Sequence, residues 1–204
     1  MTLFCLLWPP LFYLFWRSLT EHTERTGGTW ALVLGSIVAL FQFFLGSFVN
    51  PGGFGFSRWV SACVDIVALP VTLPFIVCLV FSGLRIISRE SDFTNMAFLW
   101  LVPVAALRAL SWSAGSDPLL LVGVPVLWTF VIVGMGFFIQ MIRNNWGVSV
   151  IPAIAGVVVL PLLAATAYWA LFSQRTVIGF LLFAVTLVPA SVSMITVFLE
   201  GRKR

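Results

Sequence analysis

The chain has 204 residues, of which 61% are hydrophobic and 9% are charged, and its mean hydropathy is +1.10. A soluble protein has about 45–50% apolar and about 25% charged residues, so there are too few charges here to cover a surface that faces water. This composition excludes a soluble enzyme, a disordered regulator and a disulfide-stapled secreted module. The 11 basic residues are spread over the loops rather than gathered on one face, which excludes a nucleic-acid partner.

The amino-terminal segment, residues 1–29, is apolar but short. Its hydrophobic part, Leu3–Trp16, has 14 residues and two adjacent prolines, whereas a membrane-spanning helix needs about 20 apolar residues. Tryptophan and tyrosine rings such as those of Trp8, Tyr13 and Trp16 are typical of the membrane–water interface. We therefore expect a segment that lies at the bilayer surface or against the bundle, with a further membrane span as the alternative.

Residues 30–199 contain six apolar stretches of 18 to 24 residues, each long enough to cross about 30 Å of hydrocarbon as a helix. A basic tail, residues 200–204, follows them. The predicted fold is therefore an all-α, polytopic transmembrane helical bundle with six spans, preceded by the short amino-terminal segment at the interface. The expected spans are Trp30–Val49, Trp59–Ser82, Met96–Ser113, Leu119–Ile142, Ser149–Phe172 and Val177–Leu199.

Lysine and arginine residues are distributed unequally over the connections between the spans. With six spans, eight basic residues fall on the side of the amino terminus and three, Arg58, Arg108 and Arg175, fall on the other side. Loops that face the cytoplasm carry an excess of lysine and arginine. The sequence therefore predicts a multi-pass protein of the cell membrane with both termini in the cytoplasm.

Asp65 and Arg108 are the only ionisable residues well inside the expected spans, where an isolated charge costs at least about 2.5–3.5 kcal/mol. Asp65 lies near the start of the second span and Arg108 near the end of the third, so both are expected at a similar depth towards the outer side. One interpretation is structural: an ion pair between the two helices, or an Arg108 side chain that reaches the outer headgroups. The other is functional: a polar pocket open to the outer leaflet, in which Arg108 binds an anionic headgroup or solute and Asp65 holds Arg108 in position.

Small residues form a stripe on the first expected span. Ala31, Gly35 and Ala39 are spaced four residues apart and so lie on one helix face, where another helix can approach closely. The partner is either another helix of the same chain or a second membrane protein, which includes a second copy of this chain. Seven prolines also lie within the expected spans, and they predict kinks that pack irregularly or act as hinges.

No motif for metal binding or catalysis occurs in the sequence. The three cysteines, Cys5, Cys63 and Cys78, lie in apolar stretches without the spacing of a metal site, and His22 is the only histidine. The chain also lacks an HExxH sequence, a nucleophile elbow and a phosphate-binding loop. We therefore expect no metal, no cofactor and no enzymatic activity.

The order of these features resembles the Yip domain family, the Ypt/Rab-interacting membrane proteins and their prokaryotic relatives. A short proline and aromatic segment, Trp8-Pro9-Pro10-Leu11-Phe12, precedes the first span. The third span has an aromatic-rich start and a proline, from Phe93 to Pro103, and Trp128 precedes Gly134 in the fourth. The resemblance covers about residues 3–172 and is nearest to the prokaryotic branch of the family. It implies a non-enzymatic role in membrane organisation or trafficking.

Two functions fit these observations. The first is an integral membrane protein that binds other membrane proteins or lipids of the bilayer. The alternative is a substrate-binding or transport subunit for a small solute. Six spans in a chain of 204 residues, with a small-residue stripe on the first, also resemble the substrate-capture components of energy-coupling vitamin transporters, which dock through such helix faces.

Overall fold

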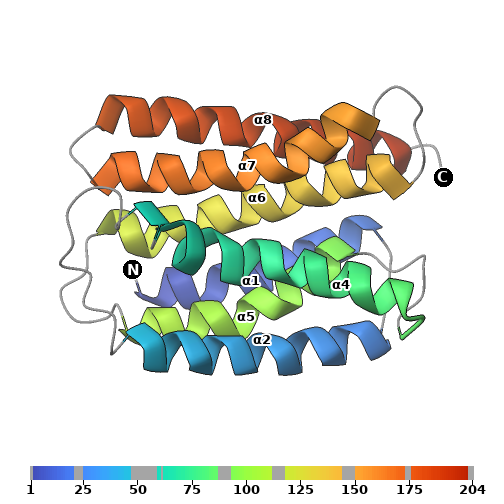
Figure 1. Cartoon of the computed structure of the whole chain (residues 1–204), viewed down its shortest axis with the longest axis horizontal. Helices are drawn as coiled ribbons and strands as arrows, with labels where there is room; N and C mark the ends of the chain where they lie inside the picture. The colour runs from blue at the N-terminus through green and yellow to red at the C-terminus, as the bar shows by residue number, and fades with distance from the viewer. Residues whose placement is uncertain are drawn as a thin grey trace.

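The computed structural model describes residues 2–20, 25–46, 59–60, 62–86, 93–111, 118–143, 150–172 and 176–201. Within these residues the chain is helical and contains no strand, which confirms the predicted all-α class. The helices follow one common axis and alternate in direction, so they form an antiparallel bundle (Figure 1). The elements are α1 (Thr2–Thr20), α2 (Arg25–Gly46), η1 (Ala62–Thr72), α4 (Leu73–Gly83), α5 (Phe93–Ser111), α6 (Pro118–Arg143), α7 (Val150–Phe172) and α8 (Thr176–Gly201).

Five apolar helical stretches of the described chain are long enough to cross a membrane. They correspond to the second to sixth expected spans, so the chain has the character of a multi-pass membrane protein. The first expected span corresponds to α2, whose described apolar part, Gly28–Phe44, is shorter than these five. The five stretches are Ile66–Gly83, Phe93–Leu110, Val122–Arg143, Ile151–Leu171 and Thr176–Leu199.

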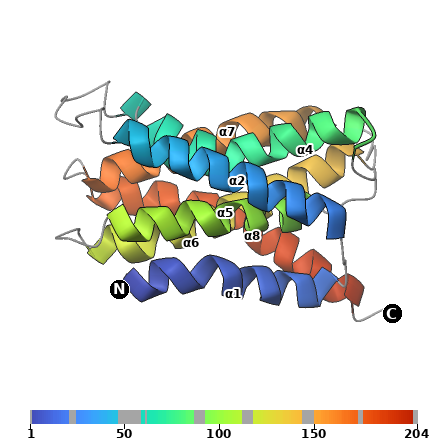
Figure 2. The same cartoon turned by 90° about the horizontal axis from the view of Figure 1, so that it is seen from below.

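The amino-terminal segment packs against the bundle, which is one of the two arrangements expected for it. Residues Thr2–Thr20 form one continuous helix, α1, which includes both Pro9 and Pro10. This helix runs lengthwise along the bundle and packs against α5 and α6 (Figure 2). Its 19 residues extend over about 28 Å, which is close to the thickness of the hydrocarbon layer.

The start of α1 and the end of α8 lie at opposite ends of the bundle (Figures 1 and 2). The expectation of both termini on one side of the membrane stays a prediction, because it depends on whether α1 crosses the bilayer. We call the end at which α1, α4, α6 and α8 finish the basic end. Among the described residues, four arginines belong to the helix ends and the turn there, Arg17, Arg25, Arg85 and Arg143, and one, Arg108, belongs to the opposite end.

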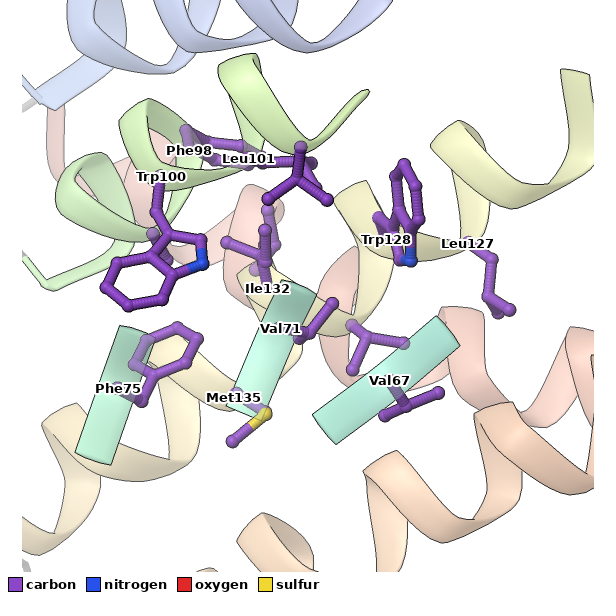
Figure 3. Close-up of a cluster of buried hydrophobic side chains, with 14 of the residues drawn as sticks. Val67, Val71, Phe75, Phe98, Trp100, Leu101, Leu127, Trp128, Ile132 and Met135 are labelled. Atoms are coloured by element: carbon purple, nitrogen blue, oxygen red, sulfur yellow. The ribbon is translucent and has the colours of Figure 1, made fainter. Parts of the chain in front are cut away.

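Two groups of helices make up the bundle. α1, α2 and α5 pack in one group and α6, α7 and α8 in the other, while η1 contacts α6 and α7 (Figure 1). Large buried side chains meet between the groups: Trp128 and Ile132 of α6, Phe98 and Leu101 of α5, and Phe75 of α4 (Figure 3). The exposed fraction of each of these five side chains is 1% or less. The centre of the bundle is therefore filled by apolar side chains, whose close packing holds helices together in a membrane.

The outer face of α8 is apolar along its whole length. The row from Val177 to Leu199 covers 23 residues, or about 33 Å of helix, which matches the hydrocarbon thickness of a bilayer. An apolar face of this length suits contact with lipid chains. The exposed side chains of this row are Val177, Leu181, Val185, Val188, Val192, Ile195 and Leu199.

The proline in η1 changes the type of helix rather than ending it. η1 is a π-helix of 11 residues that continues directly into α4, and Pro70 lies inside it. In an α-helix, Pro70 would leave the carbonyl of Ile66, four positions earlier, without a donor. A π-helix pairs each carbonyl with the fifth residue instead, and Trp128 Nε1 of α6 also donates a hydrogen bond to the Ile66 carbonyl oxygen at 2.5 Å. The Ile66 carbonyl oxygen is therefore paired within the π-helix and accepts a second hydrogen bond from a neighbouring helix.

Candidate functional site

Asp65 and Arg108 are located only in part. Arg108 lies in the last turn of α5 and is partly buried. The backbone of Asp65 belongs to η1, and its side chain lies outside the part of the chain that the structure describes. The start of η1 and the end of α5 lie together at the end of the bundle opposite the basic end (Figure 1). An ion pair or a shared pocket of these two residues stays a prediction.

The small-residue stripe of α2 packs inside the molecule. Ala31, Gly35 and Ala39 are buried, and α2 packs mainly against α5. At Gly35 the two helix backbones touch, because a Cβ atom added there would lie 2.6 Å from the Trp100 carbonyl oxygen and 2.9 Å from the Trp100 Cα atom. Of the two partners considered for the stripe, the one in contact is therefore a helix of the same chain.

Two tryptophans of the amino-terminal segment anchor α1 to the bundle. The Trp8 Nε1 atom donates a hydrogen bond to Thr129 Oγ1 at 2.9 Å, and the Thr129 hydroxyl donates to the Pro125 carbonyl oxygen, also at 2.9 Å. Trp16 is 3% exposed, and its ring centroid lies 6.4 Å from that of Phe98. An indole N–H in an apolar environment needs an acceptor from the protein, and Thr129 supplies one in the middle of α6. In the sequence, the signal for this hydrogen bond is Thr129, a polar residue inside an apolar stretch.

A narrow apolar pocket lies between α2, α4 and α5, near the basic end. It is partly open to the outside, and the space inside it is about that of one water molecule. The Trp30 and Phe81 rings meet edge to face beside it, with centroids 6.1 Å apart. We call this the lateral pocket. Its lining residues are Trp30, Ala31, Leu34, Pro74, Val77, Cys78, Phe81, Met96 and Trp100.

The wall of the lateral pocket contains one buried polar group. Trp100 is 2% exposed, and its indole N–H has no acceptor among the residues that the structure describes. Its ring lies beside that of Phe75 between α5 and α4 (Figure 3). An unsatisfied buried donor costs about 1–3 kcal/mol, so a polar atom from outside the chain would be stabilising there.

The turn that follows α4 contains an arginine four residues after Phe81, the last residue of α4 that lines the lateral pocket. The Ile86 N–H donates to the Phe81 carbonyl oxygen at 2.9 Å, and the Arg85 N–H donates to the Ser82 carbonyl oxygen at 3.2 Å. These two bonds form a Schellman motif, in which the position of Arg85 usually holds glycine because the backbone is left-handed. Arg85 has a φ of 60° and is exposed. A side chain in this conformation costs about 1–2 kcal/mol, so Arg85 is not the residue that the turn itself favours.

A second arginine at the basic end packs on an aromatic ring. The Cζ atom of Arg143 lies 4.6 Å from the centroid of the Phe93 ring. Arg143 ends α6 and Phe93 begins α5, so this cation–π contact joins two helices at the basic end. Such a contact contributes about 0.5–1 kcal/mol at an exposed site.

None of the three cysteines of the described chain is in a disulfide. Cys5 and Cys78 are buried, and Cys63 is partly buried. Across the described ranges, no group of three His, Cys, Asp or Glu side chains lies together as metal ligands would.

Comparison with known proteins gives no relative. No family model, no curated protein and no solved structure matches the chain. The resemblance to the Yip domain family therefore stays a prediction from the sequence, and the function has to be argued from the geometry of the bundle.

Proposed function

We propose that the chain crosses the membrane seven times, with its amino terminus outside and its carboxyl terminus in the cytoplasm. Support comes from α1, which lies lengthwise against α5 and α6 and is about 28 Å long. A seventh pass leaves the distribution of basic residues unchanged, with eight at the basic end and three at the opposite end. This excess favours a cytoplasmic basic end. The proposal replaces the sequence-based expectation for the amino terminus only.

We further propose that the protein is a non-enzymatic membrane protein that binds a bilayer lipid at the lateral pocket. The observation that carries this proposal is the combination of a filled bundle centre with an unfilled apolar pocket between three helices. Trp30, at the pocket, is 46% exposed, and Val80 on the next turn of α4 is 51% exposed, so the pocket is next to the outer surface. In a bilayer, the molecules at that surface are lipids.

The width and chemistry of the lateral pocket suit an acyl chain. The pocket is too small to enclose a solute, but it is partly open, so an acyl chain can lie across its opening against the exposed edge of the Trp30 ring. Each buried CH₂ group contributes about 0.8 kcal/mol when it leaves water, but a lipid chain comes from other hydrocarbon, so the gain here comes from close packing against aromatic rings. We therefore expect a lipid to bind at this one position on the protein surface, with moderate affinity.

Lipid binding agrees with a role in membrane organisation, which the resemblance to the Yip domain family implies. The alternative function, capture of a small solute, drew on the stripe of Ala31, Gly35 and Ala39 as a docking face for another protein. This stripe is already occupied by α5 of the same chain, so its support for that alternative is removed.

Spin-labelled phospholipid in nanodiscs tests lipid binding at the lateral pocket. We expect Val77→Phe to fill the pocket and reduce the motionally restricted lipid fraction in the electron paramagnetic resonance spectrum. The matched control is Val80→Phe, the same substitution one turn further along α4, where the side chain is exposed and does not line the pocket. An equal restricted fraction in both variants would contradict the proposal.

A further inference from the structure

We infer that the lateral pocket takes an anionic phospholipid of the cytoplasmic leaflet, with its acyl chain against Trp30 and Phe81 and its phosphate at Arg85. This inference rests on the proposed lipid binding and adds the headgroup class, the leaflet and the residue that selects them. Three observations on the turn after α4 support it: the depth of Arg85, its apolar neighbours and its backbone conformation.

The depth of Arg85 relative to the lateral pocket matches the build of a phospholipid. Phe81 lines the pocket, α4 ends at Gly83, about 3 Å further along the helix axis, and Arg85 lies in the turn that follows directly. The headgroup layer on each side of a bilayer is about 5–8 Å thick. An acyl chain packed beside Phe81 therefore brings its own phosphate to the level of Arg85.

The neighbours of Arg85 keep the turn at the level of the lipids. Leu84 is 66% exposed and Ile86 is 45% exposed, so an apolar side chain flanks the arginine on each side. Exposed apolar side chains at a helix end are stable when they are immersed in the bilayer. The Arg85 guanidinium is thereby held at the boundary between hydrocarbon and headgroups, where a phosphate oxygen is the natural acceptor for its fork of N–H donors.

The left-handed backbone conformation of Arg85 favours a functional role for its side chain. Glycine fits a Schellman turn without strain, and the chain has arginine there with a φ of 60°. Strain at one residue is a reason to look for a function of that residue. Among the described residues, no acidic side chain forms an ion pair with Arg85, and Glu90 and Asp92 of the following connection lie outside the described ranges.

The positive charge of the basic end indicates from which leaflet the bound lipid comes. Eight of the 11 basic residues belong to that end, which faces the cytoplasm in the proposed topology. The cytoplasmic leaflet carries the anionic lipids, and a basic residue near its surface attracts them by a factor of about five. We therefore expect about a fivefold preference for phosphatidylglycerol over phosphatidylcholine at the lateral pocket.

Arg85→Gly separates lipid selection from folding. Glycine relieves the left-handed backbone, so this variant should unfold at the same temperature as the wild type or at a higher one. Spin-labelled phosphatidylglycerol and phosphatidylcholine are compared in nanodiscs that contain the full chain. The wild type should retain phosphatidylglycerol preferentially, Arg85→Gly should lose the preference, and Arg85→Lys should keep most of it because the charge remains.

The outcomes distinguish this inference from the proposed function. If Val77→Phe abolishes lipid restriction but wild type and Arg85→Gly show the same ratio of the two lipids, the pocket binds lipid and the headgroup assignment to Arg85 is wrong. If Val77→Phe and Val80→Phe behave alike, lipid binding at the pocket itself fails. A third outcome would also overturn the inference. If adding Glu90→Gln and Asp92→Asn to the Arg85→Gly variant restores the preference for phosphatidylglycerol, then the charges of the connection after α4, and not Arg85, select the headgroup.

Discussion

The indole Nε1 of Trp128 donates a hydrogen bond to the carbonyl oxygen of Ile66 at 2.5 Å. The two residues lie on different helices, α6 and η1, and are separated by 62 positions in the chain. In an α-helix, Pro70 would leave this carbonyl without a donor. The π-helix of η1 pairs it with the fifth residue instead, and the tryptophan of α6 adds a second donor from another helix.

We predict that Trp128→Phe destabilises the bundle by about 0.5–1.5 kcal/mol, because the Ile66 carbonyl oxygen loses its bond from another helix and keeps only its partner within the π-helix. Thermal unfolding in detergent, followed by circular dichroism, measures the effect. Trp59→Phe is the control, since the Trp59 Nε1 bond to Thr166 Oγ1 is 3.1 Å long and only partly buried. Its loss should cost less.

The role of Pro70 gives a further test of the same bond. Pro70→Ala restores a backbone N–H that can bond to the Ile66 carbonyl in an α-helical turn. In the Pro70→Ala background, Trp128→Phe should therefore cost less than in the wild type, and a double-mutant cycle measures this difference. Additive effects of the two substitutions would show that the tryptophan does not compensate for the proline.

We expect Gly35→Ala to destabilise the contact between α2 and α5 by about 1–3 kcal/mol, the usual cost of overpacking. The added Cβ atom would meet backbone atoms of Trp100 at 2.6 and 2.9 Å, and backbone cannot move aside as a side chain can. Gly123→Ala is the control, because no atom lies within 4 Å of its added Cβ. That substitution should be neutral or stabilising by up to about 1 kcal/mol, since alanine favours a helix. Equal midpoints of unfolding for the two variants would contradict the close approach.

The proposed topology predicts which positions a membrane-impermeant thiol reagent reaches from outside. In a chain whose three cysteines are replaced by alanine, single cysteines at Thr2 and Gln174 should react in intact cells. A cysteine at Arg202 should react only after the membrane is opened. Protection of the Thr2 position in intact cells, together with reaction at Gln174, would mean that α1 does not cross the membrane and would restore the count of six spans.

The hydrogen bond between Trp8 and Thr129 predicts coupling between α1 and α6. Trp8→Phe and Thr129→Val each remove this bond, and interhelical bonds in membrane proteins contribute about 0.6 kcal/mol on average, with a maximum of about 1.7 kcal/mol. The double variant should be less destabilised than the sum of the two single variants. Ser18→Ala serves as a control, because the Ser18 hydroxyl bonds only to the Phe15 carbonyl within α1 and is exposed.

Much of the fold could be predicted from the sequence because it depends on local properties. Helix α6 begins at Pro118, the position at which a proline after Ser116-Asp117 is expected to start a helix. The five long apolar helices follow from stretches that must satisfy every backbone group internally once they enter lipid. The candidate site was less predictable: the lateral pocket is lined by residues of three helices, and Arg85 is unusual only through its backbone angle.

The sequence by itself determined that the chain is helical and belongs in a membrane, because composition and the lengths of apolar stretches are properties of each segment alone. Tertiary structure decided that α1 packs lengthwise along the bundle despite Pro9 and Pro10, because Thr129, the acceptor for the Trp8 indole N–H, lies 121 residues away in the chain. It also decided that the stripe around Gly35 faces α5 rather than a second protein. Such pairings depend on which helices pack together, and the sequence of one helix face does not specify which other helix will contact it.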